Sequence, residues 1–524
     1  MPIIVRHKRT MKVVTKVVLA SKSQWPFLAL AGLVSVYILL AVLIPPGADT
    51  LWRLHIAQGL LDGEILYRDL IEVNPPLWFW GAIPAAKLGG YPALVAINLL
   101  VTLVGIAVFG ALTRLTLDTK AHWGGMLGLA AGLLLVNVGE IGQREQAFLL
   151  ASALWSALVA ARIESKAIPI WLVMAATGLA AYGFALKHYF VLVPVALEAL
   201  IIWHQKRTWR PFRPENLLLA GLAGAYALAV VYLTPDFLKR VLGLVQAAYY
   251  GFGPWNAVGP VERQLRLILQ CSFAVVPMIA LILSGNKSAL VRSLMVALAL
   301  TIVIMLLQQK GWRYHLIAAN GLAIMITGLI WQSLGQVDAT RVAKRFIPLS
   351  LTVLLWTAWG QPALSNIKTH GQPMEPVLAD IVHREPRDHH IAILSTAPDN
   401  AYFPLARAKR EHWSGHYSMW MMPGLLTPQT DPKKEALRLT EKARVLAEFT
   451  SDLTCTPPDL IVGEVGYFRN PAPTLFDAMA FLREDKSFAT WLDAHYAREK
   501  DIAIYPIWRL KGLKPAPLNC SKHF

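Results

Sequence analysis

Long apolar runs recur along the first 360 residues of this sequence, and they constrain its fold more than any other feature. Each run holds about 17–25 mostly apolar residues, enough for one helix to cross roughly 30 Å of hydrocarbon. Only 16% of the 524 residues are charged, whereas soluble domains carry about a quarter. The sequence therefore predicts an α-helical polytopic membrane protein.

We place about eleven transmembrane helices on these runs. The first predicted helix follows the basic N-terminus "MPIIVRHKRTMKVVTKVV". This apolar run is too long for the core of a signal peptide and lacks a small-residue cleavage site, so we expect it to be retained as a transmembrane helix. The predicted spans lie near residues 25–45, 92–114, 122–139, 146–161, 167–184, 188–203, 216–234, 264–284, 289–307, 312–331 and 346–360.

The excess of basic over acidic residues, 50 against 33, is explained by membrane topology. With the N-terminus in the cytoplasm, the cytoplasmic loops hold about 19 Lys and Arg and the opposite loops about ten, as the positive-inside rule requires. No basic stripe with interleaved aromatic residues accompanies the excess, so the sequence predicts no nucleic-acid partner.

Residues 361–524 differ from the rest and, after an odd number of spans, fall outside the cytoplasm. They combine an amphipathic stretch, "DPKKEALRLTEKARVLAEF", with the short β-like runs "HIAILST", "DLIVGEV" and "DIAIYPIW". We predict a transmembrane domain over 1–360 and an extracytoplasmic α/β domain over 361–524. Cys455 and Cys520 lie in the latter, where an oxidising compartment would allow a disulfide between them.

Polar residues gather directly after the first span, in "GADTLWRLHIAQGLLDGEILYRDLIEVNPPLWFWGAIPAAKL". A carboxylate at Asp49 would stand at the membrane–water boundary, where it can meet a substrate whose tail lies in the bilayer. The segments around 51–61 and 75–88 have the spacing and aromatic residues of interfacial helices. Two interpretations remain open at this point: an outward-facing site, or a loop anchored by ordinary snorkelling charges.

The order of these segments resembles the first periplasmic loop of the GT-C glycosyltransferases, especially the bacterial branch related to protein O-mannosyltransferases and the lipid A aminoarabinose transferase. The matching stretch reads "D-x(8)-QGLLDGEILYRDLIEVNPPLW", and "GQREQAFLL" is similar to a segment that opens a further span in that family. The resemblance covers residues 25–160, and beyond them only the helix pattern agrees. It implies a GT-C-like fold in a bacterial inner membrane.

The resemblance also implies a reaction, the transfer of a sugar from a polyprenyl-phosphate donor to an extracytoplasmic glycolipid, polysaccharide or protein. Such a transfer needs a carboxylate that accepts the acceptor's proton and cations that stabilise the leaving phosphate. Asp49 is the candidate base, Asp69 a second candidate that would position the acceptor or support Asp49, and Glu72 a weaker substrate-binding candidate. For Asp69, a turn cap in "YRD" is the alternative.

Candidate cations occur at the outer ends of several predicted spans. A helical bundle would gather these ends around one pocket, and Arg and Lys both bind phosphate. Each of them alone fits a snorkelling charge better, but their recurrence in three outer loops favours at least one phosphate contact. The predicted substrate-binding residues are Arg144 in "GQREQ", Lys187 and His188 in "LKHYF", and Arg313 and His315 in "GWRYH".

The sequence predicts neither a metal site nor a cofactor. His188 and His315 belong to no HxxxH or CxxC spacing that would support a closed metal site, and Asp49 is followed by Thr50 where many relatives have a second acidic residue. Two other functions stay open, a transporter or flippase for lipid-linked glycans and a polymerase or ligase for them. The absence of a clear repeat between the halves, and the gathering of ionisable residues at one face, favour the enzyme.

Overall fold

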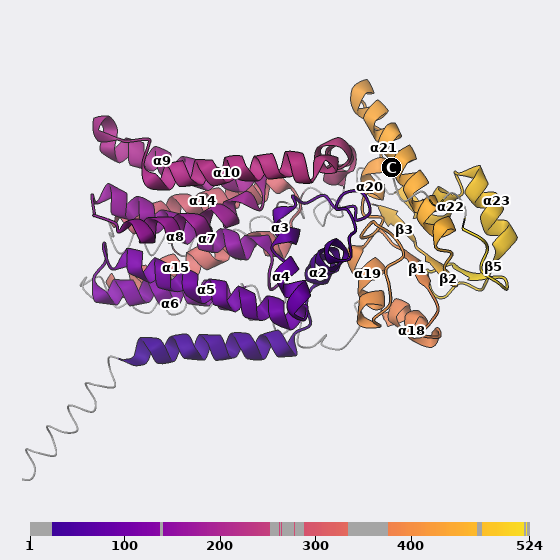
Figure 1. The fold of residues 1–524 in the computed structure, drawn as a ribbon, viewed down its shortest axis with the longest axis horizontal. Coiled ribbons are helices and arrows are strands. Elements are labelled where there is room, and N and C mark those ends of the chain that lie inside the picture. Colours follow the sequence, from indigo (N-terminus) through magenta and orange to yellow (C-terminus); the bar gives the residue numbers. More distant parts are fainter. Residues whose placement is uncertain are drawn as a thin grey trace, which may run out of the picture.

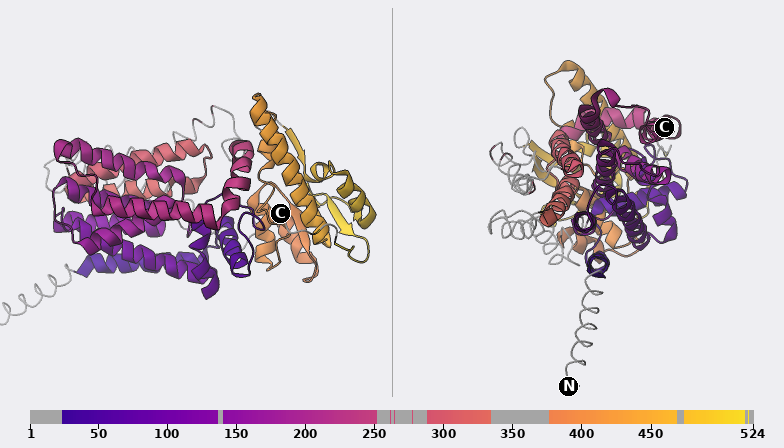
Figure 2. Two further views of the ribbon diagram at one scale, coloured as in Figure 1. Left: turned by 45° about the horizontal axis from the view of Figure 1, so that its top comes forward. Right: turned by 90° about the vertical axis from the view of Figure 1, so that its left-hand side faces the viewer.

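The structure, a computed structural model, describes residues 24–136, 140–251, 288–333, 376–468 and 474–517, together with 261, 264, 277 and 520. Long helices run side by side along the long axis of the molecule, and a part that contains helices and strands covers one end of them (Figure 1). The same end-to-end arrangement is visible after a 45° turn in the left panel of Figure 2. The short helix α2 (Ala48–Leu61) lies between the two parts.

Six described helical segments are long and apolar enough to cross a membrane, and two further apolar segments, 170–185 and 314–330, are shorter. They are the helices of a membrane protein. Together with α6 (Thr119–Leu135), these segments make up the described part of the bundle: the helix Gln24–Leu43, α5 (Tyr91–Thr113), α7 (Arg144–Ile163), α8 (Ile170–Ala185), α9 (Leu192–Gln205), α10 (Pro214–Leu233), α14 (Ala289–Gln308) and α15 (Ile317–Ser333).

Each of these helices coincides with a predicted span. The spans expected near 264–284 and 346–360 fall outside the described residues, apart from residues 264 and 277. The number of eleven spans, the orientation and the boundary between two domains near residue 360 therefore stay predictions.

Small residues allow α6 and α15 to approach closely. A Cβ added to Gly128 would lie 2.8 Å from Met325 Cα, and one added to Gly132 would lie 2.9 Å from Gly321 Cα. Because apolar side chains gain little by leaving lipid for another helix, membrane helices rely on such close backbone contact. Buried leucines of α7 complete this interface, and an added Cβ on Gly321 would collide with the Leu149 side chain.

The topology leads to a labelling prediction. Arg210 and Lys433 are both exposed, and the topology predicted from the loop charges puts them on opposite sides of the membrane. In a chain in which Ser replaces Cys271, a membrane-impermeant maleimide should label Lys433→Cys from outside and label Arg210→Cys only after lysis. Labelling of Arg210→Cys from outside, without labelling of Lys433→Cys, would reverse the orientation.

The first predicted outer loop forms α2, then α3 (Leu77–Trp80) and α4 (Ile83–Leu88). The break between α3 and α4 agrees with the predicted short, interrupted segment. The apolar face of α2 is buried within the protein: Trp52 is 1% exposed, and Ile56 and Ala57 are fully buried. Trp52 stacks on Tyr417 with ring centroids 4.8 Å apart, so α2 is covered by the C-terminal part of the chain.

The C-terminal part contains the predicted mixture of helices and strands. Its four-stranded sheet has the order β1-β2-β6-β5, with β1 parallel to β2 and the other pairs antiparallel. The strands are β1 (Ile391–Leu394), β2 (Leu460–Gly463), β6 (Ile507–Leu510) and β5 (Tyr496–Arg498), and β3 (Val465–Phe468) pairs with β4 (Thr474–Asp477). The run "DIAIYPIW" becomes a strand only from Ile507, because Ile502 and Tyr505 close a turn through an isolated bridge.

Helices surround this sheet, and short helical turns join the elements of the bundle. The C-terminal helices are α18 (Pro376–Arg384), α19 (Pro398–Arg407), α20 (Met422–Leu425), α21 (Pro432–Cys455), α22 (Ala478–Leu482) and α23 (Lys486–His495). The connecting turns are η1 (His188–Val191), η2 (Lys206–Thr208), the π-helical η3 (Phe237–Val241), α11 (Leu242–Ala248), η4 (Tyr249–Gly251) and η7 (Arg313–Leu316).

A buried charge cluster joins the bundle side to the C-terminal part. Glu448 of α21 binds Arg240 of η3 at 2.6 Å, Arg444 at 2.8 Å and the His416 ring at 2.7 Å. Although burial alone would raise it, these partners hold the pKa of Glu448 well below its usual range. Because a buried carboxylate without its cations is costly, this cluster fixes α21 against the end of the bundle.

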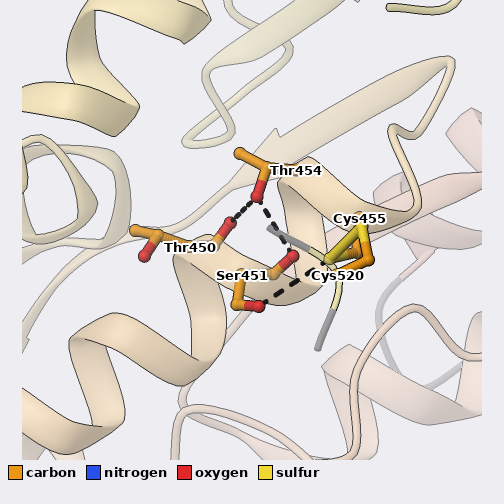
Figure 3. Close-up of a disulfide and its surroundings, with 5 residues drawn as sticks. All are labelled: Thr450, Ser451, Thr454, Cys455 and Cys520. Atoms are coloured by element: carbon orange, nitrogen blue, oxygen red, sulfur yellow. Dashed lines mark hydrogen bonds between the residues drawn. A yellow bond between two sulfur atoms is a disulfide. The ribbon is translucent and has the colours of Figure 1, made fainter. Parts of the chain in front are cut away.

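Cys455 and Cys520, whose pairing the sequence left open, form a disulfide with Cα atoms 5.2 Å apart (Figure 3). The bond closes a loop with a sequence separation of 65 residues. We expect Cys455→Ser to lower the free energy of unfolding of the C-terminal part by about 2–4 kcal/mol, because the open chain gains entropy when unfolded. Thermal melts with and without reductant should differ for the wild type and coincide for Cys455→Ser. Two free thiols in non-reducing mass mapping would contradict the bond.

Candidate active site

A cavity of about 270 Å³ opens where the bundle, the first-loop helices and the C-terminal part meet. Three of the predicted site residues line it: Asp49, Glu72 and Arg144. The remaining residues that line the cavity are mostly acidic and aromatic. They are Trp52, Asn74, Trp78, Glu140, Tyr249, Trp312, Tyr314, Asp399, Tyr417 and Trp420, with Ala48, Val73 and Pro398.

Asp49 and Glu140 share one amide donor. Asp49 lies in the first turn of α2, where a negative charge is favoured by the helix dipole. Gln143 Nε2 donates to Asp49 Oδ2 at 3.0 Å and to Glu140 Oε2 at 3.3 Å. Burial and the neighbouring Asp49 raise the pKa of Glu140 to about 8. At neutral pH Glu140 is therefore mostly protonated, which limits the negative charge beside Asp49.

The C-terminal part contributes a third acid. Asp399 lies in the first turn of α19 and lines the cavity with Asp49. Burial, followed by the charge of Asp49, raises its pKa to about 6. Sequence reasoning missed this residue because 350 positions separate the two acids, and only the fold brings α19 onto α2.

Glu72 organises the loop through hydrogen bonds with the protein. Its Oε1 accepts from Val73 N at 2.6 Å, Asn74 N at 3.2 Å and Asn74 Nδ2 at 2.8 Å, and its Oε2 accepts from Trp52 Nε1 at 2.9 Å. A carboxylate offers about four such lone-pair positions. Glu72 therefore borders the cavity, but its oxygens are largely occupied by the chain itself.

Asn74 connects this loop to Arg144. The Tyr67 hydroxyl donates to Asn74 O at 2.6 Å, and Asn74 Oδ1 accepts from Arg144 Nη1. Tyr67 is fully buried with a φ of 70°, a backbone conformation that bulky residues rarely adopt without a surrounding structure that enforces it. Tyr67 and Glu72 thus hold Asn74, and Asn74 orients the guanidinium.

Arg144 is the cation of the cavity. Its guanidinium carbon lies 4.3 Å from the centre of the Trp78 ring, and within the described residues its Nε–H has no hydrogen-bond partner. The turn before it depends on Gly142, which has a φ of 88°. Gly142 O accepts from Arg53 Nη1 at 2.8 Å and from Trp78 Nε1 at 3.0 Å. A buried, oriented guanidinium with a donor to spare suits the oxygens of a phosphate.

Lys187 and His188 do not line the cavity. Lys187 is buried and donates to Glu145 Oε1 at 2.6 Å and to Gln308 Oε1 at 2.8 Å. His188 is exposed, and its ring contacts the Tyr189 ring with centroids 3.7 Å apart. Lys187 thus joins α7 to α14 behind the cavity, and its placement gives no support to a direct phosphate contact.

The segment "GWRYH" reaches the cavity through its aromatic residues. Trp312 and Tyr314 line it, whereas His315 is buried behind them, its ring 4.5 Å from that of Tyr314. The backbone of Arg313 begins η7, and its side chain lies outside the described part of the structure.

Lys310, which we did not predict, is fully buried behind the wall of the cavity. Its ammonium group donates to Tyr249 O, and burial lowers the pKa of Lys310 to about 7.

Asp69 lies away from this cavity. Its Oδ2 accepts from Ile65 N at 2.8 Å, which is the turn cap considered as the alternative. It lines a separate, more polar cavity with His55 and His412. The structure therefore does not bring Asp69 to the cavity that Asp49 lines.

Among the described residues, no group of three or more His, Cys, Asp or Glu side chains is arranged to hold a metal ion. The expectation that the site works without a metal stays a prediction.

The raised pKa of Glu140 leads to a pH prediction. As the pH rises through about 8, Glu140 loses its proton and the cavity gains a negative charge. The affinity for an anionic phosphodiester donor, whose own charge is constant in this range, should therefore fall by up to about tenfold. Glu140→Gln should lack this fall in donor affinity near pH 8. Any fall in affinity near pH 7 that comes from the loss of charge on Lys310 should remain in the variant. Identical profiles for wild type and variant would contradict the assignment.

Comparison with known proteins gives a likeness in fold. No protein-family model and no curated protein matches the sequence. The crystal structure of ArnT from Cupriavidus metallidurans bound to undecaprenyl phosphate is similar, with a TM-score of 0.54 and 12% identity over 95% of this chain and 100% of that one. The apo oligosaccharyltransferase of Archaeoglobus fulgidus matches 92% of this chain and 80% of its own with 12% identity, but its TM-score of 0.46 is too low to carry an argument.

Proposed function

We propose that this chain, which has the GT-C glycosyltransferase fold that its sequence predicted, transfers a sugar from a polyprenyl-phosphate donor to an acceptor outside the cytoplasm. The observation that carries the proposal is the joint placement of Asp49 and Arg144 in one cavity at the end of an apolar helical bundle. A candidate base and a candidate phosphate ligand thus face the same space. The similar structure of ArnT holds undecaprenyl phosphate, which agrees with a lipid phosphate as donor.

The reaction follows from these positions. A hydroxyl or amine of the acceptor attacks the anomeric carbon and gives its proton to Asp49. The new bond to the acceptor forms as the bond between the anomeric carbon and the phosphate oxygen breaks. The electron pair leaves with polyprenyl phosphate, and Arg144 stabilises the charge that develops there.

The other wall residues assist this chemistry. Gln143 holds the Asp49 carboxylate through a hydrogen bond at 3.0 Å, and a protonated Glu140 leaves Asp49 as the proton acceptor. The rings of Trp312 and Trp420 line the same cavity and are the candidates to pack against a sugar. Asp399 and Tyr417 come from the C-terminal part, so that part would complete the site and take part in acceptor recognition.

Product formation by the purified full-length protein tests the proposal. A panel of polyprenyl-phosphate sugars is incubated with envelope glycolipid, polysaccharide and protein fractions, and the release of polyprenyl phosphate is measured. We expect release from one donor, and only when an acceptor fraction is present. A flippase would move the lipid-linked sugar across a bilayer and leave it intact. Movement of the lipid without release of polyprenyl phosphate from any donor would therefore refute the proposed enzymatic function.

A further inference from the structure

The connection between α9 and α10 lies at the end of the bundle that is far from the C-terminal part (Figure 1). Its exposed face carries Lys206, Arg207 and Arg210. The exposed Arg292, in the first turn of α14, belongs to the same end, because its Nη1 lies 3.5 Å from Nε2 of His204 in the last turn of α9. We call these four cations, Lys206, Arg207, Arg210 and Arg292, the basic end. None of them lines the candidate active site.

The carboxylates beside the basic end are occupied inside the protein. Glu198 binds Arg213 at 2.5 Å. Glu215, which is 2% exposed, binds Arg213 at 2.9 Å and Arg162 at 2.8 Å. Nη1 of Arg213 also donates to Arg210 O at 2.8 Å, so this network fixes the backbone of the connection. Within the described residues, the side chains of the basic end form no ion pair with a carboxylate, and their positive charge is therefore available to a partner.

Large exposed rings and a lipid-facing helix adjoin these cations. Trp203 is 78% exposed and Phe212 is 80% exposed, and in the sequence they flank the three cations of the connection. Aromatic rings beside Lys and Arg side chains are typical of the headgroup region of a membrane. The helix α10 follows directly, and no residue in its most apolar stretch is buried within the protein. The lipid-facing surface of the bundle therefore continues up to the basic end.

We propose that the basic end binds the phosphate headgroup of an anionic glycerophospholipid. The planar guanidinium groups of Arg207 and Arg210 match the oxygens of a phosphate. The acyl chains of such a lipid would lie along α10, and its glycerol region would meet the exposed rings of Trp203 and Phe212. A soluble anion would compensate the cations but leave both rings in water. The predicted topology puts the basic end in the cytoplasm, where the anionic lipids of the membrane attract such residues.

The test is native mass spectrometry of the purified full-length protein, titrated with phosphatidylglycerol or with phosphatidylcholine of the same acyl chains. The wild type should bind phosphatidylglycerol about tenfold or more tightly than phosphatidylcholine, because each cation near an anionic headgroup strengthens binding by about fivefold. Arg207→Gln/Arg210→Gln should remove most of this preference. The matched control, Lys433→Gln/Lys434→Gln, removes two exposed charges at the start of α21 and should bind phosphatidylglycerol like the wild type.

A second measurement needs no variant. Phosphatidylglycerol with a diazirine in its headgroup should label residues 203–214 or the start of α14 in the wild type, as located by mass spectrometry. Label found only elsewhere, or an equal affinity for the two lipids, would overturn the proposal. An equal loss of affinity in both double variants would also overturn it, because net charge alone would then explain the binding. Displacement of the lipid by inorganic phosphate would assign the cations to a soluble anion instead.

Discussion

Asp49→Asn is expected to lower the rate of sugar transfer by about 10²–10⁴-fold, the usual effect of losing a general base. Asparagine keeps the size of the side chain, and its oxygen still accepts the hydrogen bond that Gln143 donates at 3.0 Å. It accepts no proton at neutral pH, so the step that fails is the chemical one. Single-turnover transfer should collapse while the dissociation constant of undecaprenyl phosphate stays within about threefold of wild type.

Asp69→Asn is the matched control, because the same change is made in the same loop. Asparagine can still cap the turn at Ile65 N, and the side chain lies outside the candidate active site. Near-normal transfer is expected. If Asp69→Asn were inactive and Asp49→Asn active, the general base would be assigned to Asp69. Normal transfer by both variants would refute the proposed enzymatic function.

The second large effect is expected at Arg144. Arg144→Ala removes a charge-assisted contact that acts on the bound phosphate and strengthens as charge develops on the leaving group. Hydrogen bonds to charged groups contribute about 1.5–3 kcal/mol, so donor affinity should fall by about 10–100-fold and turnover should fall as well. Binding of undecaprenyl phosphate and steady-state transfer measure the two effects separately.

Arg68→Ala is the control for the loss of an arginine in the outer loops. Arg68 pairs with Asp236 at 3.0 Å and its side chain is 40% exposed, and such exposed pairs contribute little to stability. Donor affinity like that of the wild type is expected. A loss of affinity in Arg68→Ala equal to that in Arg144→Ala would indicate a general electrostatic effect instead of a phosphate site.

The sequence was most informative where chemistry is local. Apolar run lengths predicted the described helices of the bundle, and the alternation in "HIAILST" and "DLIVGEV" predicted β1 and β2. Asp49, Glu72 and Arg144 were predicted from short segments and do line the cavity. In each case a few neighbouring residues carry the signal, so the rest of the fold is not needed to read it.

The remaining site residues depend on contacts between distant segments. Asp399 reaches the cavity because α19 packs on α2. No local pattern in "APDNAY" predicts that contact. Glu140 stands four residues before the predicted Arg144, but its role depends on burial beside Asp49. Lys187 was expected at the cavity and instead binds Glu145, because a buried lysine takes the nearest carboxylate.

The most direct measurement is a cryo-EM structure of the full-length protein with undecaprenyl phosphate bound. The account predicts a phosphate oxygen within hydrogen-bond distance of the Arg144 guanidinium, in the cavity that Asp49 lines. Lipid phosphate bound away from Arg144, with the cavity around Asp49 unoccupied, would contradict it.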